Sequence, residues 1–384
     1  MAEITLLAGT AMKTVVLGAY GNFGARICRA LALRPEIELI IAGRNQARAA
    51  RLANNIGGRA TAATIDAADP ALSQQLRSLG AELVIHTAGP FQQQGYAVPL
   101  ATAQAGAHYI DLADGRRFVC DFEHACGDAF RRQGRTAVTG ASTVPSLSSA
   151  VVDALSAGWR GIDRIDVCIA PAQTAPRGVA TMAAVLDYCG APINVWEDGA
   201  WTVRYGWDAP QAETFLGMRP RRGALCDIPD LEIFPQHYPG VRTVMFRAAL
   251  EIPLTQFALA GMAKLRRAGL VRSPARFAQA MHKLADCMNP FGSALGGMVV
   301  RVAGRDSEDR PVRYAWHLTA DDDHGPEIPC MPAILLAERL GRRVPSDPGA
   351  RSSVSLLSLA DFRPEFAKWN MSEHVVQEAG VHGT

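Results

Sequence analysis

The 384-residue sequence lacks a hydrophobic run long enough to cross a membrane, and its N-terminus lacks the pattern of an export signal. The longest apolar stretch, 252–265, is interrupted by Gln256 and followed by basic residues. We expect this stretch to form a packed or interface helix, with an interfacial helix at a membrane surface as the alternative. These absences predict a cytoplasmic protein without stable membrane insertion.

Paired cysteines and concentrated positive charge are missing as well. The eight cysteines are scattered, and no two have the spacing of a metal knuckle or a redox pair. We therefore expect reduced thiols and predict no metal site. The formal net charge is only +2, without a concentrated basic tract, which argues against nucleic acid as a partner.

Two enzyme signatures are also absent. The Gly-x-Ser-x-Gly elbow of a serine hydrolase does not occur. A short-chain dehydrogenase needs a tyrosine four residues before a lysine, and none of the four lysines has one. Neither class of enzyme fits this sequence.

What the sequence does contain is a strand, a glycine loop and a helix near its start. Val15, Val16 and Leu17 suit a buried strand, which the loop Gly18-Ala19-Tyr20-Gly21-Asn22-Phe23-Gly24 follows. The first glycine permits the turn, the second lets a pyrophosphate approach the backbone, and the third lets the helix pack on the sheet. Free N–H groups at the helix start favour phosphate. The loop therefore predicts dinucleotide binding.

The second strand, 38–42, ends at the position where such a fold binds the adenosine ribose and distinguishes NAD from NADP. The residues there are Gly43, Arg44 and Asn45, and none is acidic. A guanidinium such as that of Arg44 can bind a 2′-phosphate and stack on adenine. We therefore expect NADP(H) rather than NAD(H) as the cofactor. The alternative is that Arg44 is a solvated loop cation.

Strand and helix patterns alternate through the first third of the chain and then change. The first third predicts an α/β fold with a doubly wound parallel Rossmann sheet, its strands near 13–18, 38–42, 60–65, 81–86, 107–112 and 135–139. From about residue 160, alternating patterns and a hairpin of 298–302 with 312–318 predict a second, α+β domain. A helix is expected over 331–340, and the tail past Pro364 is weakly patterned and expected to be mobile.

Residues 86–112 make the interpretation more specific. His86-Thr87-Ala88-Gly89-Pro90-Phe91 ends the fourth strand, and Gly106-Ala107-His108-Tyr109-Ile110-Asp111 leads through the fifth. With the glycine loop and the later segment 140–146, this combination resembles the saccharopine dehydrogenase-like family of NADP-binding proteins. The resemblance is strong over 13–155 and loose over 160–345.

The resemblance implies a Rossmann domain, a second mixed-sheet domain and a C-terminal helix that returns to the first domain, with boundaries at 1–158, 159–328 and 329–384. It implies nicotinamide chemistry at a C–N or C=N bond of an amino acid-like substrate. It further implies that Asp66 lies near adenine, that Tyr96 and Asp111 face the substrate cleft as catalytic residues, and that the nicotinamide and its ribose are lined by Thr87, Ala88, Gly89, Pro90 and Phe91.

The residues themselves indicate the same edge of the sheet. Ligands of a doubly wound sheet bind beyond the carboxyl ends of its strands, where Gly89, Asp111 and Thr143 are expected. Asp111 is suited to move the proton that accompanies hydride transfer. The alternative is that it caps a helix or pairs with Arg116 or Arg117.

The second domain offers one candidate for the substrate. Arg177 precedes an apolar helix, so it suits a substrate carboxylate, with a surface arginine as the alternative. We expect Thr143 and Arg177 to contact the substrate, and Arg177 to face Asp111 across the cleft. The stretch 252–265 favours a homodimer through this domain.

Two other functions stay open at this point. One is a non-catalytic NADP-binding sensor or membrane-associated scaffold, and the other is a carbonyl reductase. The sequence does not name the substrate, because the divergent domain is the one that selects it.

Overall fold

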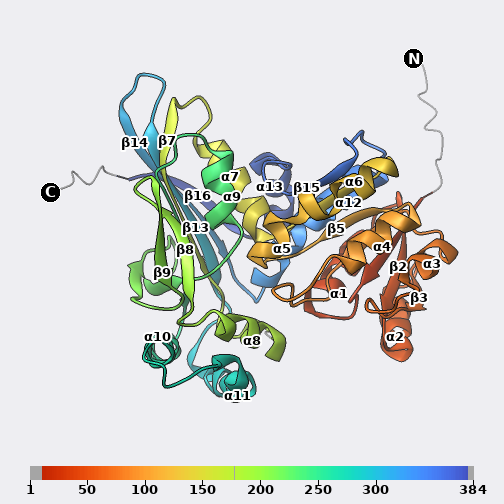
Figure 1. The fold of residues 1–384 in the computed structure, drawn as a ribbon, viewed down its shortest axis with the longest axis horizontal. Helices are drawn as coiled ribbons and strands as arrows, with labels where there is room; N and C mark the ends of the chain where they lie inside the picture. The colour runs from red at the N-terminus through yellow and green to blue at the C-terminus, as the bar shows by residue number, and fades with distance from the viewer. Residues whose placement is uncertain (1–10, 177, 379–384) are drawn as a thin grey trace.

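The computed structural model describes residues 11–176 and 178–378 of the chain, so Arg177 lies outside the described residues. The molecule consists of two sheets with helices between and around them (Figure 1). The first sheet is parallel and has seven strands in the order β15-β6-β5-β4-β1-β2-β3. These are β1 (Met12–Leu17), β2 (Ile37–Gly43), β3 (Thr61–Thr64), β4 (Leu83–His86), β5 (His108–Asp111), β6 (Thr136–Thr139) and β15 (Gly349–Ser352).

Helices cover both faces of this sheet because successive residues of its strands point to opposite sides. Val16 belongs to the core under α1 (Asn22–Leu31) and α2 (Gln46–Ile56), whereas Val15 belongs to the opposite core. The helices of that opposite core are α3 (Leu72–Ser78), α4 (Ala97–Ala105), α5 (Arg116–Cys120) and α6 (Phe122–Arg132). The expected doubly wound fold is confirmed.

The second sheet is mixed and has nine strands. Its main path is β10 (Gln211–Glu213), β11 (Arg221–Leu225), β12 (Thr243–Leu250), β7 (Gly161–Ala170), β13 (Gly296–Arg305), β14 (Pro311–Ala320) and β16 (Ser372–Gln377). The hairpin of β8 (Pro192–Glu197) and β9 (Ala200–Tyr205) joins through β12. The expected hairpin near 298–318 is β13 with β14.

Further helices lie between the sheets or at the outer end of the second one. They are η1 (Thr143–Leu147), α7 (Ser148–Leu155), α8 (Val179–Asp187), α9 (Asp230–His237), α10 (Pro253–Arg267), η2 (Pro274–Phe277), α11 (Ala278–Cys287), η3 (Asn289–Phe291), η4 (Gly325–Cys330), α12 (Met331–Gly341) and α13 (Leu359–Lys368). No helix in the described residues is long and apolar enough to cross a membrane.

The C-terminal segment differs from its expected form. Helix α12 packs on α1, and β15 then adds a seventh strand to the first sheet beside β6. The chain next returns to the second sheet, where β16 pairs with β14. The tail past Pro364 was expected to be mobile, but it continues α13 and forms β16.

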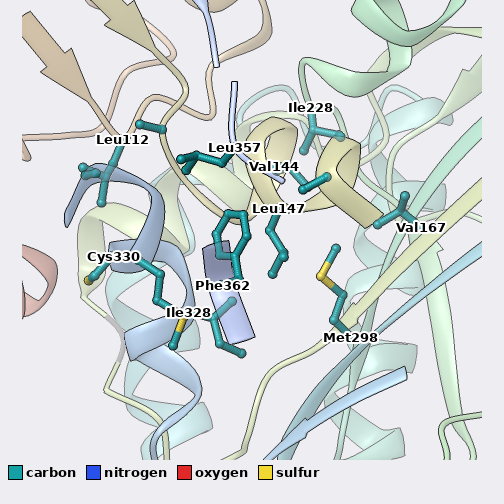
Figure 2. Close-up of a cluster of buried hydrophobic side chains, with 14 of the residues drawn as sticks. Leu112, Val144, Leu147, Val167, Ile228, Met298, Ile328, Cys330, Leu357 and Phe362 are labelled. Atoms are coloured by element: carbon teal, nitrogen blue, oxygen red, sulfur yellow. The ribbon is translucent and has the colours of Figure 1, made fainter. Parts of the chain in front are cut away.

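One hydrophobic core joins the two domains (Figure 2). It includes Leu112 after β5, Leu147 of η1, Val167 of β7, Met298 of β13 and Phe362 of α13. Because these residues come from both sheets, the domains share buried apolar surface at their junction. This shared core holds the carboxyl edge of the first sheet against the second domain.

Candidate functional site

The glycine loop after β1 has the geometry of a phosphate cradle. Gly18 has a φ of +77°, and a Cβ at Gly24 would lie 2.4 Å from the Gly18 carbonyl oxygen. A Cβ at Gly21 would meet only that same oxygen within 4 Å, at 3.1 Å, so the loop is open on this side. Gly21 precedes α1 without a side-chain cap, and the first turn contains no acidic residue. The free N–H groups and the positive end of the helix dipole therefore suit a pyrophosphate.

At the end of β2, an aromatic ring and two cations stand where NAD-binding Rossmann folds have an acidic residue that binds the ribose hydroxyls. The Tyr20 ring packs against Gly43, where a Cβ would lie 2.5 Å from the ring. The guanidinium of Arg48 lies 4.6 Å from the centroid of that ring. Arg44, which directly follows Gly43, is exposed. Asn45 caps α2 by accepting a hydrogen bond from the Arg48 N–H at 2.9 Å.

Arg48 is a residue that sequence reasoning missed, although it lies one helical turn after Arg44. Two exposed arginines at the end of β2 fit a 2′-phosphate. Asp66, which follows β3, is exposed and accepts a hydrogen bond from the Ala68 N–H at 3.1 Å.

The loop after β4 is hydrogen-bonded to the last residue of β1, directly before the glycine loop. The Thr87 hydroxyl and N–H both donate to the Leu17 carbonyl oxygen, at 2.8 and 2.9 Å. The Phe91 ring is buried and lies 5.1 Å from the His86 ring, so it faces the core. Gly89 and Pro90 are exposed, and the Gln94 amide donates to the Ala88 carbonyl oxygen at 2.7 Å. The exposed backbone of this loop is thus available to a ligand.

Asp111 is wholly buried, so the expectation that it faces the cleft is wrong. Its Oδ1 accepts hydrogen bonds from the N–H groups of Ala113 and Gly140, at 2.9 and 2.8 Å, and from the Thr139 hydroxyl at 2.9 Å. Burial raises the pKa of its carboxyl to about 6, although these hydrogen bonds favour the charged form. Asp111 ties the end of β5 to the end of β6.

Tyr96 also differs from its expected role. Its hydroxyl lies 3.2 Å from the Phe118 carbonyl oxygen and 3.3 Å from that of Arg117, and it donates to them. Its ring packs on the Phe118 ring with centroids 5.0 Å apart. Burial, with the nearby Asp121 charge, raises the pKa of the hydroxyl to about 12. The side chain therefore fixes α4 against α5.

Asp114, three residues past Asp111, is the carboxylate that stays open at this edge. It is exposed and accepts a hydrogen bond from the Gln92 amide at 3.1 Å. Desolvation by the surrounding protein nevertheless raises the pKa of its carboxyl. Access to solvent together with a raised pKa is typical of a carboxylate on the floor of a cleft. Sequence reasoning missed Asp114, although it lies in the same strand-end turn as Asp111.

The turn that carries Asp114 lies against the loop after β4 on one side and near the second domain on the other. A Cβ at Gly115 would lie 3.0 Å from the Phe91 carbonyl oxygen, so the two loops are in close contact. Tyr188, at the end of α8, is near enough that the Asp114 charge adds to burial in raising the pKa of its hydroxyl well above the usual value.

Arg116 connects the two domains beside this turn. Its guanidinium contacts Asp227 at 3.1 Å and Glu232 at 2.9 Å, and it donates to the Asn194 carbonyl oxygen at 2.8 Å. Arg117 pairs with Glu232 as well. The suggested pairing of either arginine with Asp111 is therefore wrong.

The second domain also reaches the glycine loop. The Asn22 side-chain amide donates to the Pro176 carbonyl oxygen at 3.3 Å, which brings the segment before α8 to the start of α1. Thr143 is half-buried at the start of η1. Arg177 lies outside the described residues, so its expected contact with the substrate stays a prediction, but the buried Asp111 is not available to face it across the cleft. Among the described residues, no cluster of three or more His, Cys, Asp or Glu side chains forms a metal site.

The fold and the glycine loop define a dinucleotide-binding protein with a Rossmann domain. Residues 14–144 match the family model described as the saccharopine dehydrogenase NADP binding domain. The first domain is therefore similar to the NADP-binding domain of saccharopine dehydrogenases. The resemblance stated from the sequence is confirmed, and the match supports NADP(H) as the cofactor.

Two solved structures are similar over nearly the whole chain. Saccharopine dehydrogenase (L-Glu forming) from Saccharomyces cerevisiae aligns with a TM-score of 0.69 and 12% identity, covering 96% of this chain and 100% of that one. Homospermidine synthase from Legionella pneumophila, in complex with NAD, aligns with a TM-score of 0.60 and 10% identity, covering 96% and 92%. At these identities the likeness shows the shared fold alone. No curated protein matches the sequence.

Proposed function

We propose that the protein is an NADP(H)-dependent oxidoreductase acting on a C–N or C=N bond of an amino acid-like substrate. The observation that carries this proposal is Asp114, a solvent-accessible carboxylate with a raised pKa beside the loop after β4. The carboxyl edge of a doubly wound sheet is where ligands bind, and Asp114 lies just beyond the end of β5 at that edge.

A carboxylate in this position favours an amine or imine over a neutral carbonyl. A protonated nitrogen has a positive charge that the ionised Asp114 attracts, whereas Asp227 of the second domain is already paired with Arg116 at 3.1 Å. Burial raises the pKa of Asp227 as well, against the lowering effect of Arg116. A neutral carbonyl substrate would gain less from the Asp114 carboxylate.

These contacts indicate the role of each residue in the reaction. When bound, NADPH supplies a hydride to an electrophilic carbon. Asp114, whose pKa desolvation raises, would donate a proton to the imine nitrogen, and its carboxylate would then attract the iminium that forms. Gln92 holds the carboxyl in place. Asp111 acts as a positioning residue, because it fixes the ends of β5 and β6 without touching the cleft.

The test is NADPH oxidation by the full-length protein with candidate imines, formed from pairs of amino acids and oxo acids. Asp114→Asn should lower kcat at least about a hundredfold while leaving NADPH affinity unchanged. Asp128→Asn, an exposed carboxylate on α6, is the matched control. Reduction should slow as the pH rises through the raised pKa of Asp114, because the protonated acid is lost. A wild-type rate and pH profile for Asp114→Asn would remove Asp114 from the mechanism.

We also propose a homodimer formed through the second domain. The observation that favours it is β16, which pairs with β14 on one side and exposes Val375 (51%) and Val376 (39%). An edge strand with exposed β-branched residues can pair with its copy across a twofold axis. Light scattering should give twice the mass of one chain, which is 41.1 kDa. Val375→Lys should convert the dimer to a monomer with the mass of one chain.

A further inference from the structure

Helix α10 has a buried face and, opposite it, an exposed apolar face, where the Arg222 guanidinium of β11 lies 5.8 Å from the centroid of the Phe257 ring. Thr255, Gln256, Leu259, Ala260 and Ala263 form the buried face. The opposite face has Leu254, Phe257 and Leu265, which are 62%, 52% and 43% exposed, and Leu270 just beyond the helix is 72% exposed. We call these four residues the apolar stripe. Their spacing places the first three on one side of the helix.

Basic residues surround the apolar stripe. Residues 252–292 contain six basic residues and one acidic residue, Asp286, whereas the whole chain has a formal net charge of only +2. The rest of the chain is therefore net acidic. Among the described residues, Arg267 is the one of the six that pairs with a carboxylate, that of Asp208. Arg266 donates instead to the carbonyl oxygens of Asp187 and Cys189, so its charge is not neutralised.

We propose that the apolar stripe docks on the surface of a lipid bilayer with anionic headgroups. Exposed leucine and phenylalanine side chains would enter the boundary between headgroups and acyl chains, and Lys264 and Arg272 would contact lipid phosphates. Helix α10 is too short and too charged at its end to span the bilayer, so the docking is peripheral. In Figure 1, α10 and α11 lie at the outer end of the second domain, away from the first sheet.

The charge pattern favours a bilayer over a second copy of the chain as the occupant. In a twofold dimer the same surface meets itself, so a basic surface would face its own positive charges. An anionic bilayer instead attracts every cation around the stripe. Two more apolar residues of the same basic segment are also exposed, Leu284 (41%) on α11 and Phe291 (74%) on η3.

The test is co-sedimentation of the full-length protein with vesicles of phosphatidylcholine, alone or with about 30 mol% phosphatidylglycerol. We expect binding to the anionic vesicles that falls steeply between about 0.05 and 0.5 M salt, and little binding to the neutral ones. Leu254→Ser with Phe257→Ser should weaken binding at least about fivefold. Leu33→Ser, a residue that is 73% exposed on the first domain, is the matched control.

A second pair of variants separates charge from apolar contact. Lys264→Gln with Arg272→Gln should weaken binding by about fivefold for each charge and reduce the salt dependence, whereas Arg132→Gln on α6 should not. Equal binding to both kinds of vesicle, or unchanged binding by the Leu254 and Phe257 double variant, would overturn the proposal. A dimer that this double variant converts to monomer, without vesicle binding, would show that a second copy covers the stripe.

Discussion

The guanidinium of Arg48 lies over the Tyr20 ring, 4.6 Å from its centroid, and the Tyr20 hydroxyl accepts a hydrogen bond from the Asn45 N–H at 3.0 Å. These contacts hold the start of α2 beside the glycine loop, at the point where β2 ends. A 2′-phosphate there would meet Arg48 and the exposed Arg44 together.

We therefore expect NADPH to bind at least about tenfold more tightly than NADH, because one charge-assisted contact contributes roughly 1.5–3 kcal/mol. Arg44→Ala and Arg48→Ala should each reduce this ratio, and the double variant should abolish it. Arg51→Ala, an exposed arginine on the same helix, should leave the ratio unchanged. Calorimetry with both nucleotides measures all five proteins, and equal wild-type affinities would contradict the assignment.

Gly21→Val should abolish NADPH binding while leaving the fold intact. The side chain would occupy the open side of the loop, where a pyrophosphate approaches, and the backbone φ of this residue is compatible with valine. Gly161→Val, at a second glycine with open space and no positive φ, is the control. Thermal shift on adding NADPH reports binding, and circular dichroism reports the fold. Normal NADPH binding by folded Gly21→Val would mean that the loop is misassigned.

The first sheet could be predicted from the sequence because its central strands are short apolar runs between turn residues. The strand β15 could not, since Gly349-Ala350-Arg351-Ser352 has no apolar run, and its place depends on pairing with β6. The same applies to β16, whose six residues are mostly exposed and gain their order from β14. Local patterns do not encode such long-range pairing.

The nucleotide end of the site was likewise more predictable than the substrate end. The glycine loop acts through its own backbone, so its spacing carries the signal. Asp111 and Asp114 are both aspartates at the end of the same strand. Asp111 is buried against β6, whereas Asp114 is exposed to solvent near Tyr188. Only the packing of distant segments separates the two roles.

Asp230 should make stability depend on pH in a way that its amide variant does not. It is 1% exposed, its Oδ2 accepts a hydrogen bond from the Ser148 hydroxyl at 2.6 Å, and burial raises its pKa from 3.8 to about 7. The folded state therefore holds a proton that the unfolded state loses, so this contribution is present at low pH and is lost as pH rises through about 7. Asp230→Asn stays neutral throughout.

Urea unfolding at about pH 5 and about pH 8 measures the difference. The stability of Asp230→Asn relative to wild type should increase by about 2 kcal/mol between these pH values. Asp153→Asn is the control, because Asp153 is close to Asp230 in the fold but more exposed. Its carboxylate accepts a hydrogen bond from the Tyr238 hydroxyl at 2.9 Å. A constant difference between Asp230→Asn and wild type would show that Asp230 does not titrate in this range.

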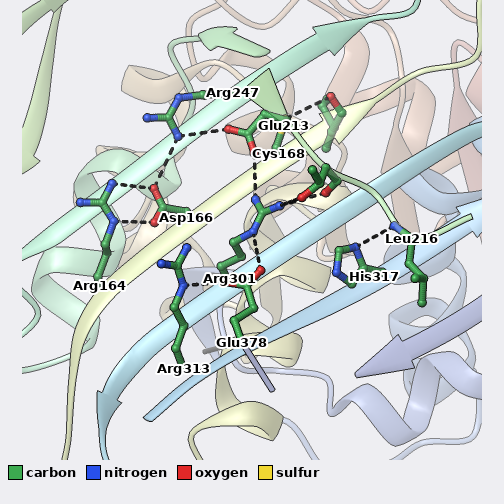
Figure 3. A network of polar contacts seen from close by, with 12 residues as sticks. Arg164, Asp166, Cys168, Glu213, Leu216, Arg247, Arg301, Arg313, His317 and Glu378 are labelled. Carbon is green, nitrogen blue, oxygen red and sulfur yellow. Dashed lines mark hydrogen bonds and ion pairs between the residues drawn. The ribbon is translucent and has the colours of Figure 1, made fainter. Parts of the chain in front are cut away.

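The outer face of the second sheet has a network of charges that should stabilise the fold only as a complete set (Figure 3). Arg301 on β13 is 8% exposed and contacts Glu213 at 2.8 Å and Glu378 at 3.1 Å. It also donates to the Thr214 carbonyl oxygen at 2.9 Å. Removing the arginine would leave the Glu213 carboxylate buried with Arg247, at 3.5 Å, as its other cation.

Arg301→Ala should therefore destabilise the protein by about 3 kcal/mol, because a buried charge that loses its partner is costly. Arg301→Met together with Glu213→Leu should cost less than Arg301→Ala alone, since the pair is replaced by apolar groups of similar size. Arg204→Ala, which removes an exposed pair with Glu197, should change stability by less than about 1 kcal/mol. Urea unfolding of the four proteins decides the question. If the double variant is less stable than Arg301→Ala, the Glu213 carboxylate stabilises the sheet even without Arg301, through its contact with Arg247.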